Sequence, residues 1–193
     1  MHKQLYCIRH GEALHNVLYP KIGTKAYTDY LDTPLTEKGV LQSKTLNKTF
    51  KEIDDIELVL VSPLTRTLDT CVNIFKNKTI PILSLDELVE HPQSKEKCNK
   101  RDKTINLKKK YKSINFSFLN DESIYWSDEY NSKKELLKLE NRISQLKSFI
   151  KSRKEMKIAI VSHSTFLKKF LYDDYDTDFC KELKHCYPYK IKI

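Results

Sequence analysis

The 193-residue sequence lacks the features that mark membrane-spanning and secreted proteins. No apolar run approaches the roughly 18 residues of a transmembrane helix, so we expect no membrane insertion. The first residues, Met-His-Lys-Gln-Leu, contain neither the long apolar stretch nor the small-residue cleavage site of a signal peptide. These two absences predict a cytoplasmic protein.

The sequence also lacks the clustered cysteines and histidines of a zinc site. Its five cysteines are odd in number and scattered, and neither a CxxC nor an HExxH spacing occurs. Disulfide frameworks are typical of small secreted proteins, so we expect free thiols here. We therefore predict no structural metal.

Positive charge is plentiful and unevenly distributed. Lys and Arg number 35 against 26 acids, and residues 95–112 alone contain nine Lys or Arg and two acids. Such an excess indicates a phosphate-bearing partner, which could be a phosphorylated substrate, a nucleic acid or an anionic membrane surface. Because aromatic residues do not interleave with this run before Tyr111, it lacks the stacking pattern of a single-strand binder, and we expect no nucleic acid partner.

Four short apolar runs alternate with helical patterns. The runs cover residues 5–8, 56–61, 79–83 and 157–161, and their continuous apolarity is typical of strands buried on both faces of a parallel sheet. Amphipathic patterns lie between and after them, and Ser62-Pro63 is expected to begin the helix that follows the second run. The alternation predicts an α/β fold, a three-layer α/β/α sandwich with a mostly parallel central sheet.

One segment, residues 91–130, breaks this alternation. It is basic first and aromatic later, with weak periodicity over about 40 residues. A stretch of this length within a compact domain is more typical of a functional insertion or lid than of a linker. We predict a single domain over residues 1–193 with a cap-like insertion at about 91–130.

Three of the apolar runs end in residues suited to phosphate chemistry. Arg9 and His10 follow the first run, Arg66 stands shortly after the second, and His163 follows the fourth. The carboxyl ends of parallel strands form the ligand crevice of open α/β sheets, so these side chains can converge there. Arg binds phosphate oxygens bidentately, and a neutral His can attack phosphorus. A single His after a strand is more often structural, but the same pattern at three strand ends indicates an anion pocket.

These residues resemble the signatures of a known family, the histidine phosphatase superfamily in its phosphoglycerate-mutase-like group. The matching segments, in the family's order, are Arg9-His10-Gly11-Glu12 with His15-Asn16, Leu35-Thr36-Glu37-Lys38-Gly39 with Gln42, Ser62-Pro63-Leu64-Thr65-Arg66-Thr67, Leu88-Val89-Glu90-His91 and Val161-Ser162-His163. The run Ser164-Thr165-Phe166 is similar to the yeast and plant mutase-like branch.

The resemblance implies a metal-independent phosphoryl transfer through a phosphohistidine on His10, with no cofactor. Arg9, Arg66 and His163 would neutralise charge on the phosphoryl oxygens, and Asn16 would contact the phosphoryl group or the substrate. Glu90 would protonate the leaving oxygen and then activate water, with Glu87 as the rival acid.

The sequence favours a phosphatase over its alternatives. Mutases of the family usually carry Arg-His-Tyr-Gly after the acid, whereas His91-Pro92-Gln93 stands here. The alternatives are a phosphoglycerate-mutase-type phosphomutase and a catalytically silent phosphate-binding module. The expected partner is a small phosphorylated substrate.

The basic insertion raises the question of a polyanionic substrate. Cys98-Asn99-Lys100-Arg101 resembles a basic stretch of the plant and yeast branch, which makes Lys100 and Arg101 candidates for binding a second anionic group. The alternative is that residues 95–112 are a solvated surface.

Overall fold

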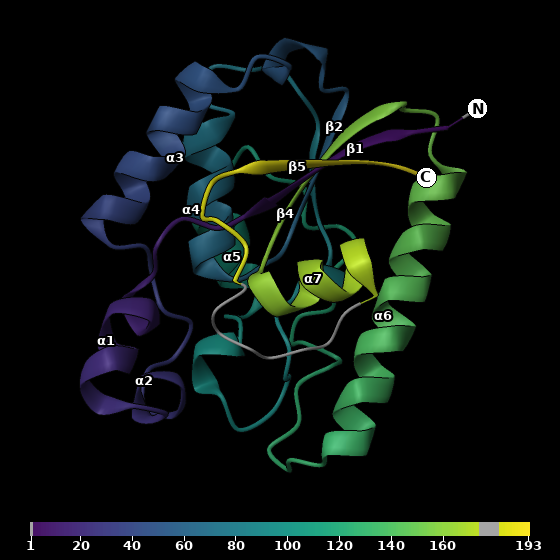
Figure 1. Cartoon of the computed structure of the whole chain (residues 1–193). Helices are drawn as coiled ribbons and strands as arrows, with labels where there is room; N and C mark the ends of the chain where they lie inside the picture. Colours follow the sequence, from purple (N-terminus) through teal and green to yellow (C-terminus); the bar gives the residue numbers. More distant parts are fainter. Residues whose placement is uncertain (1, 174–181) are drawn as a thin grey trace.

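A five-stranded sheet lies at the centre of the computed structural model, which describes residues 2–173 and 182–193 (Figure 1). The strands are β1 (Gln4–Arg9), β2 (Leu58–Val61), β3 (Ile82–Ser84), β4 (Lys157–Ser162) and β5 (Pro188–Lys192). Their order is β3-β2-β4-β1-β5, with every neighbouring pair parallel except β1 and β5. The predicted mostly parallel sheet is confirmed.

Helices cover both faces of this sheet, as Figure 1 shows with α3 and α4 on one side and α6 on the other. One face packs against α3 (Glu37–Thr49), α4 (Thr65–Ile74) and α5 (Thr104–Lys110), and the other against α6 (Ser132–Ser152) and α7 (Ser164–Tyr172). Because successive strand residues point to opposite faces, Ile8 joins the first apolar cluster and Cys7 the second. The three-layer α/β/α arrangement is confirmed.

Two short helices stand apart from these layers. Helices α1 (Leu14–Ile22) and α2 (Lys25–Thr28) follow β1 and pack on each other. Single 3₁₀ turns lie at Ile53–Asp55, Asp86–Leu88 and Lys97–Asn99. The contact between α2 and the turn at Lys97–Asn99 brings the segment after β1 next to the segment after β3.

The start of α4 differs from the sequence prediction. The helix begins at Thr65 rather than at Ser62-Pro63. Its first turn is capped from a distant loop, since the Asp32 carboxylate accepts hydrogen bonds from the Thr65 N–H at 2.9 Å and the Thr65 hydroxyl at 2.8 Å. Ser62 lies before the helix, and its hydroxyl forms a hydrogen bond with Nε2 of His163.

The segment 91–130 divides into parts with different surroundings. Residues 104–116 join the main core, where Leu107, Tyr111 and Phe116 are buried in the first apolar cluster. Residues near 91–99 line a cavity at the carboxyl ends of the strands. A cap-like role for the segment stays a prediction. In the part of the chain that is described, no helix combines the length and apolarity needed to cross a membrane.

Candidate active site

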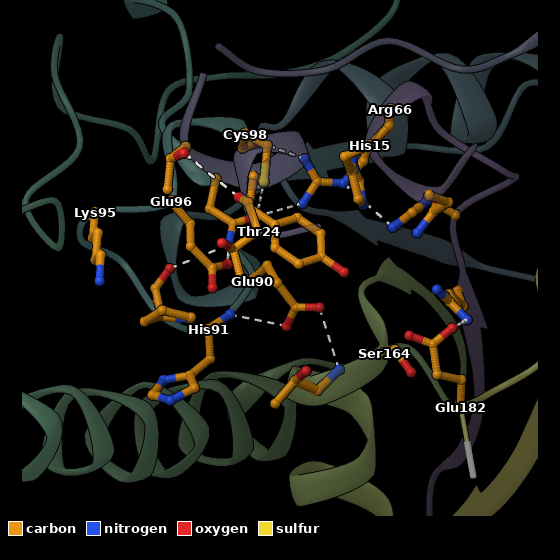
Figure 2. Close-up of a pocket in the computed structure, with 18 of the residues that line it drawn as sticks. His15, Thr24, Arg66, Glu90, His91, Lys95, Glu96, Cys98, Ser164 and Glu182 are labelled. Atoms are coloured by element: carbon orange, nitrogen blue, oxygen red, sulfur yellow. Dashed lines mark hydrogen bonds and ion pairs between the residues drawn. The ribbon is translucent and has the colours of Figure 1, made fainter. Parts of the chain in front are cut away.

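Of the side chains predicted at the strand ends, all except His163 line one cavity. It has a volume of about 460 Å³ and lies where β1, β2 and β4 end. Arg9, His10, Asn16, Arg66 and Glu90, all predicted site residues, line it. Figure 2 shows Arg66 and Glu90 reaching this pocket from different segments of the chain.

His10 is held with one ring nitrogen directed at a cation. Its Nδ1 lies 2.6 Å from the Gly11 carbonyl oxygen, and its Nε2 lies 3.3 Å from Nε of Arg66. A carbonyl can only accept and a guanidinium can only donate, so Nδ1 carries the proton and Nε2 carries the lone pair. Burial, together with the charge of Arg66, holds the pKa of His10 well below its usual range. The ring is therefore neutral at neutral pH, with its lone pair on Nε2.

Arg66 is fixed by the segment after β3. Its Nη1 donates to the Cys98 carbonyl at 2.6 Å, and its Nη2 donates to Oδ1 of Asn99 at 2.8 Å. The side chain is buried, so these bonds replace the water that an exposed guanidinium would bind. The arrangement leaves the Nε edge turned toward His10.

Two further buried groups beside His10 offer unused donor or acceptor atoms. His163 bonds through Nε2 to the Ser62 hydroxyl at 2.8 Å, while its Nδ1 has no hydrogen-bond partner. Its ring centroid lies 5.2 Å from that of His10. Arg9 bonds through Nη1 to the Leu183 carbonyl and to Glu182, each at 2.7 Å, while its Nε is unpartnered. Buried polar atoms without partners are rare, and oxygens of a bound anion can supply such partners.

Glu90 lines the cavity, as do Glu96 and Glu182. One carboxylate oxygen accepts the N–H groups of His91 at 2.9 Å and Phe166 at 3.0 Å, and the other accepts that of Thr165 at 3.3 Å. Burial nevertheless raises the pKa of this carboxyl, which favours the protonated form that a general acid needs. The rival Glu87 does not line the cavity, so the geometry favours Glu90.

Asn16 also lies in the cavity wall. Its Oδ1 accepts a hydrogen bond from the Ala13 N–H at 2.9 Å, within the first turn of α1. This bond orients the side-chain amide, and its NH₂ group is the part left for contact with an anion.

Lys100 and Arg101 do not line the cavity, contrary to the expected substrate contact. Arg101 is buried and pairs with the Asp86 carboxylate through Nε at 2.7 Å and Nη2 at 3.0 Å. Its remaining donors bond to carbonyls and a hydroxyl of the insertion, so this guanidinium serves the structure. Lys100 lies over the Trp126 ring at 5.1 Å and near Asp128, on the outside of the insertion.

Several residues around the cavity were missed from the sequence. They include His15, Glu96, Asn99 and Glu182. His15 stands next to Asn16 in the first signature, and its Nδ1 bonds the Thr33 hydroxyl at 2.6 Å. Asn99 belongs to the basic stretch 98–101, from which only its two cations were selected. Glu96 and Glu182 match no motif, so only the folded chain reveals them. Among the described residues, no group of three or more potential metal ligands comes together.

Comparison with known proteins agrees with this geometry. The profile of the family described as histidine phosphatase superfamily (branch 1) matches residues 5–178. A phosphoglycerate mutase-like protein of Arabidopsis thaliana is 28% identical over 216 aligned residues, which cover 94% of this chain and 78% of the relative. The adenosylcobalamin/alpha-ribazole phosphatase of Salmonella typhimurium is 34% identical over 87 residues, covering 45% of this chain and 40% of the relative.

Solved structures share the fold. The alpha-ribazole phosphatase of Shigella flexneri superposes with a TM-score of 0.60 at 22% identity, covering 95% of this chain and 87% of that one. The phosphoserine phosphatase of Entamoeba histolytica, in complex with 3-phosphoglyceric acid, has a TM-score of 0.56 at 19% identity, covering 97% and 94%. At these identities the likeness concerns the fold.

Proposed function

This chain belongs to the histidine phosphatase superfamily, and we propose that it is a phosphatase that hydrolyses a small phosphomonoester through a phosphohistidine on His10. The observation that carries the proposal is the orientation of the His10 ring. Its protonated nitrogen is bound to Gly11, and its lone pair faces the cation of Arg66. A buried, neutral imidazole beside a guanidinium suits attack on an anionic phosphoryl group.

The first step forms a bond between Nε2 of His10 and phosphorus and breaks the bond from phosphorus to the leaving oxygen. Glu90, protonated beforehand, gives its proton to that oxygen. The equatorial oxygens gain negative charge, and Arg9, Arg66 and His163 supply the compensating donors. Asn16 contacts the phosphoryl group through its amide.

The second step transfers the phosphoryl group to water. Glu90, now ionised, takes a proton from the water molecule as the oxygen attacks phosphorus, and the bond to His10 breaks. The products are inorganic phosphate, the free imidazole and the protonated Glu90, so the cycle closes. No metal or cofactor enters either step, and a location in the cytoplasm stays a prediction of the sequence.

Two alternatives remain for the same pocket. A phosphomutase would return the phosphoryl group to a second hydroxyl of the substrate, and a binding module would hold phosphate without turnover. The name of the Arabidopsis relative makes the first worth testing directly.

The decisive experiment measures phosphate release from a panel of phosphorylated metabolites, with and without EDTA, for the wild-type chain and for His10→Ala. We expect release that resists EDTA, together with an acid-labile phosphoenzyme that His10→Ala abolishes. Isomerisation of a phosphoglycerate without phosphate release would identify a mutase. Binding without turnover or label would identify a binding module, and inhibition by EDTA restored by Mg²⁺ or Zn²⁺ would contradict the mechanism.

A further inference from the structure

We propose that Glu96 selects phosphomonoesters whose alcohol part carries a positively charged amine, that is, phosphates of amino alcohols. The inference rests on the proposed function, because it names the substrate class of the same pocket. It replaces the polyanionic substrate expected from the basic insertion, since Lys100 and Arg101 both lie outside the cavity.

The pocket is lined by charges of both signs, and Lys95 and Lys168 lie in its wall together with Glu96. The cations that suit a phosphoryl group, Arg9 and Arg66, stand beside His10, as described above. Glu96 lines the wall built by the segment after β3, and Figure 2 shows it on the side of the pocket where Glu90 lies. We infer that a phosphomonoester with its phosphorus at His10 places its alcohol part in this wall, beside Glu96.

Glu96 has no salt-bridge partner among the described residues. Its Oε2 accepts a hydrogen bond from Nδ2 of Asn99 at 3.0 Å. The same amide accepts the hydrogen bond of Arg66 through Oδ1, so Asn99 stands between the carboxylate and the guanidinium. Lys95, its neighbour in sequence, also lines the cavity, but its side chain forms no ion pair with Glu96 in the described structure.

An ionised Glu96 disfavours the binding of a phosphomonoester whose alcohol part is uncharged. Burial, followed by the charge of Glu90, raises the pKa of Glu96 to about 7, although the charges of Arg66 and Lys95 and the hydrogen bond from Asn99 act in the opposite direction. An ionised Glu96 also repels a dianionic phosphate that enters the pocket. An ammonium group on the substrate stabilises the ionised Glu96 and offsets its repulsion of the phosphate. A second anionic group on the substrate strengthens that repulsion.

A second side chain of the wall is suited to the same ligand. Tyr27 lines the cavity, with one ring face against Tyr19 at a centroid distance of 5.1 Å. Burial, followed by the charges of Glu182 and Glu96, raises the pKa of Tyr27, so its hydroxyl end lies within the field of both carboxylates. An aromatic ring beside a carboxylate is a common setting for binding an ammonium group.

The test compares two phosphates of equal size, 2-aminoethyl phosphate and n-propyl phosphate, in the wild-type chain, Glu96→Gln and Glu122→Gln. Glutamine keeps the size of Glu96 and its hydrogen bond with Asn99 while removing the charge. Glu122→Gln removes a charge from the same insertion at an exposed ion pair with Lys103, away from the cavity. The alcohols differ as leaving groups, so the decisive quantity is the change in the ratio of their kcat/KM values between variants.

We expect Glu96→Gln to lower the kcat/KM ratio of aminoethyl to propyl phosphate by about tenfold, and Glu122→Gln to leave it within about twofold. A loss by the same factor on both substrates would overturn the proposal and assign Glu96 a structural role. Binding of 2-aminoethylphosphonate and propylphosphonate, measured by calorimetry, gives the same comparison without turnover. If the chain binds the aminophosphonate more tightly than propylphosphonate but hydrolyses no phosphate, only the proposed function is contradicted. If the wild type and Glu96→Gln each bind both phosphonates equally, the proposed selectivity is contradicted.

Discussion

The Nε atom of Arg66 lies 3.3 Å from Nε2 of His10, while both other nitrogens of its guanidinium are held by residues 98 and 99. A lysine at this position has one nitrogen and cannot satisfy these three directions together. We predict that Arg66→Lys lowers kcat by about a hundredfold or more and that Arg66→Ala lowers it further. Steady-state kinetics, with circular dichroism as a check of folding, measure this. Arg153→Lys, at a partly exposed ion pair with Glu155, should retain activity, and an Arg66→Lys enzyme of near-normal kcat would remove Arg66 from the reaction.

Glu90 should matter most for substrates whose leaving groups are strongly basic. An alkoxide needs a proton as it departs, whereas a nitrophenolate does not. We predict that Glu90→Gln slows an alkyl phosphate at least about tenfold more than it slows p-nitrophenyl phosphate. Burial raises the pKa of Glu90, so the wild-type rate on the alkyl substrate falls as pH rises and the carboxyl ionises. Glu90→Gln should show a smaller decline, which reflects the ionisation of Glu96 with its pKa of about 7. The matched control is Glu87→Gln, and a stronger leaving-group effect there would make Glu87 the acid.

The strand ends of this site could be predicted because each is a local pattern. A buried apolar run followed by Arg9-His10 or by Ser162-His163 predicts both the strand and the place of its candidate site residue. Strands β1 and β4 are neighbours in the sheet, and the ring centroids of His10 and His163 lie 5.2 Å apart. Glu90 was predicted on other grounds, because Leu88-Val89-Glu90-His91 resembles a signature of the family.

The remaining features depend on contacts between distant segments. The start of α4 is set by Asp32, which stands 33 residues before Thr65, so the local Ser-Pro pattern was misleading. Arg101 was predicted to bind a second anionic group of the substrate, yet it is buried and pairs with Asp86 on a separate turn. Glu182 reaches the cavity from the loop before β5 and pairs with Arg9 from β1. Neither hydrophobic periodicity nor a sequence motif indicates such contacts between residues that are far apart in the sequence.

Close approach of two backbone segments makes Gly39 sensitive to any side chain. A Cβ atom at this position would lie 2.1 Å from the Glu12 carbonyl oxygen, because the first turn of α3 packs against the loop after β1. We predict that Gly39→Ala lowers the free energy of unfolding by about 3 kcal/mol, as overpacking of a rigid contact does. Urea denaturation measures the change. Gly23→Ala separates steric overlap from backbone strain. Its Cβ would meet no atom within 4 Å, but its backbone, with φ 61° and ψ −142°, lies in a region that is essentially restricted to glycine and costs about 1–3 kcal/mol for alanine. A Gly39→Ala variant as stable as the wild type would show that the loop shifts easily.

The carboxyl of Asp32 should make stability depend on pH. Burial raises its pKa from 3.8 to about 6, so the folded chain holds a proton that the unfolded chain has released. The resulting stabilisation is complete below about pH 4 and is lost as pH rises through about 6.

In Asp32→Asn the side-chain amide can still accept the Thr65 N–H but does not ionise. We predict that between about pH 4 and 7 the variant gains up to about 3 kcal/mol of unfolding free energy relative to wild type, at about 1.4 kcal/mol for each unit of pKa shift. Other titrating groups, such as Glu96 and His185, are common to both proteins and cancel in this difference. Urea denaturation curves at several pH values measure it, and a stability difference that stays constant across this range would mean that the Asp32 carboxyl titrates normally in the folded chain.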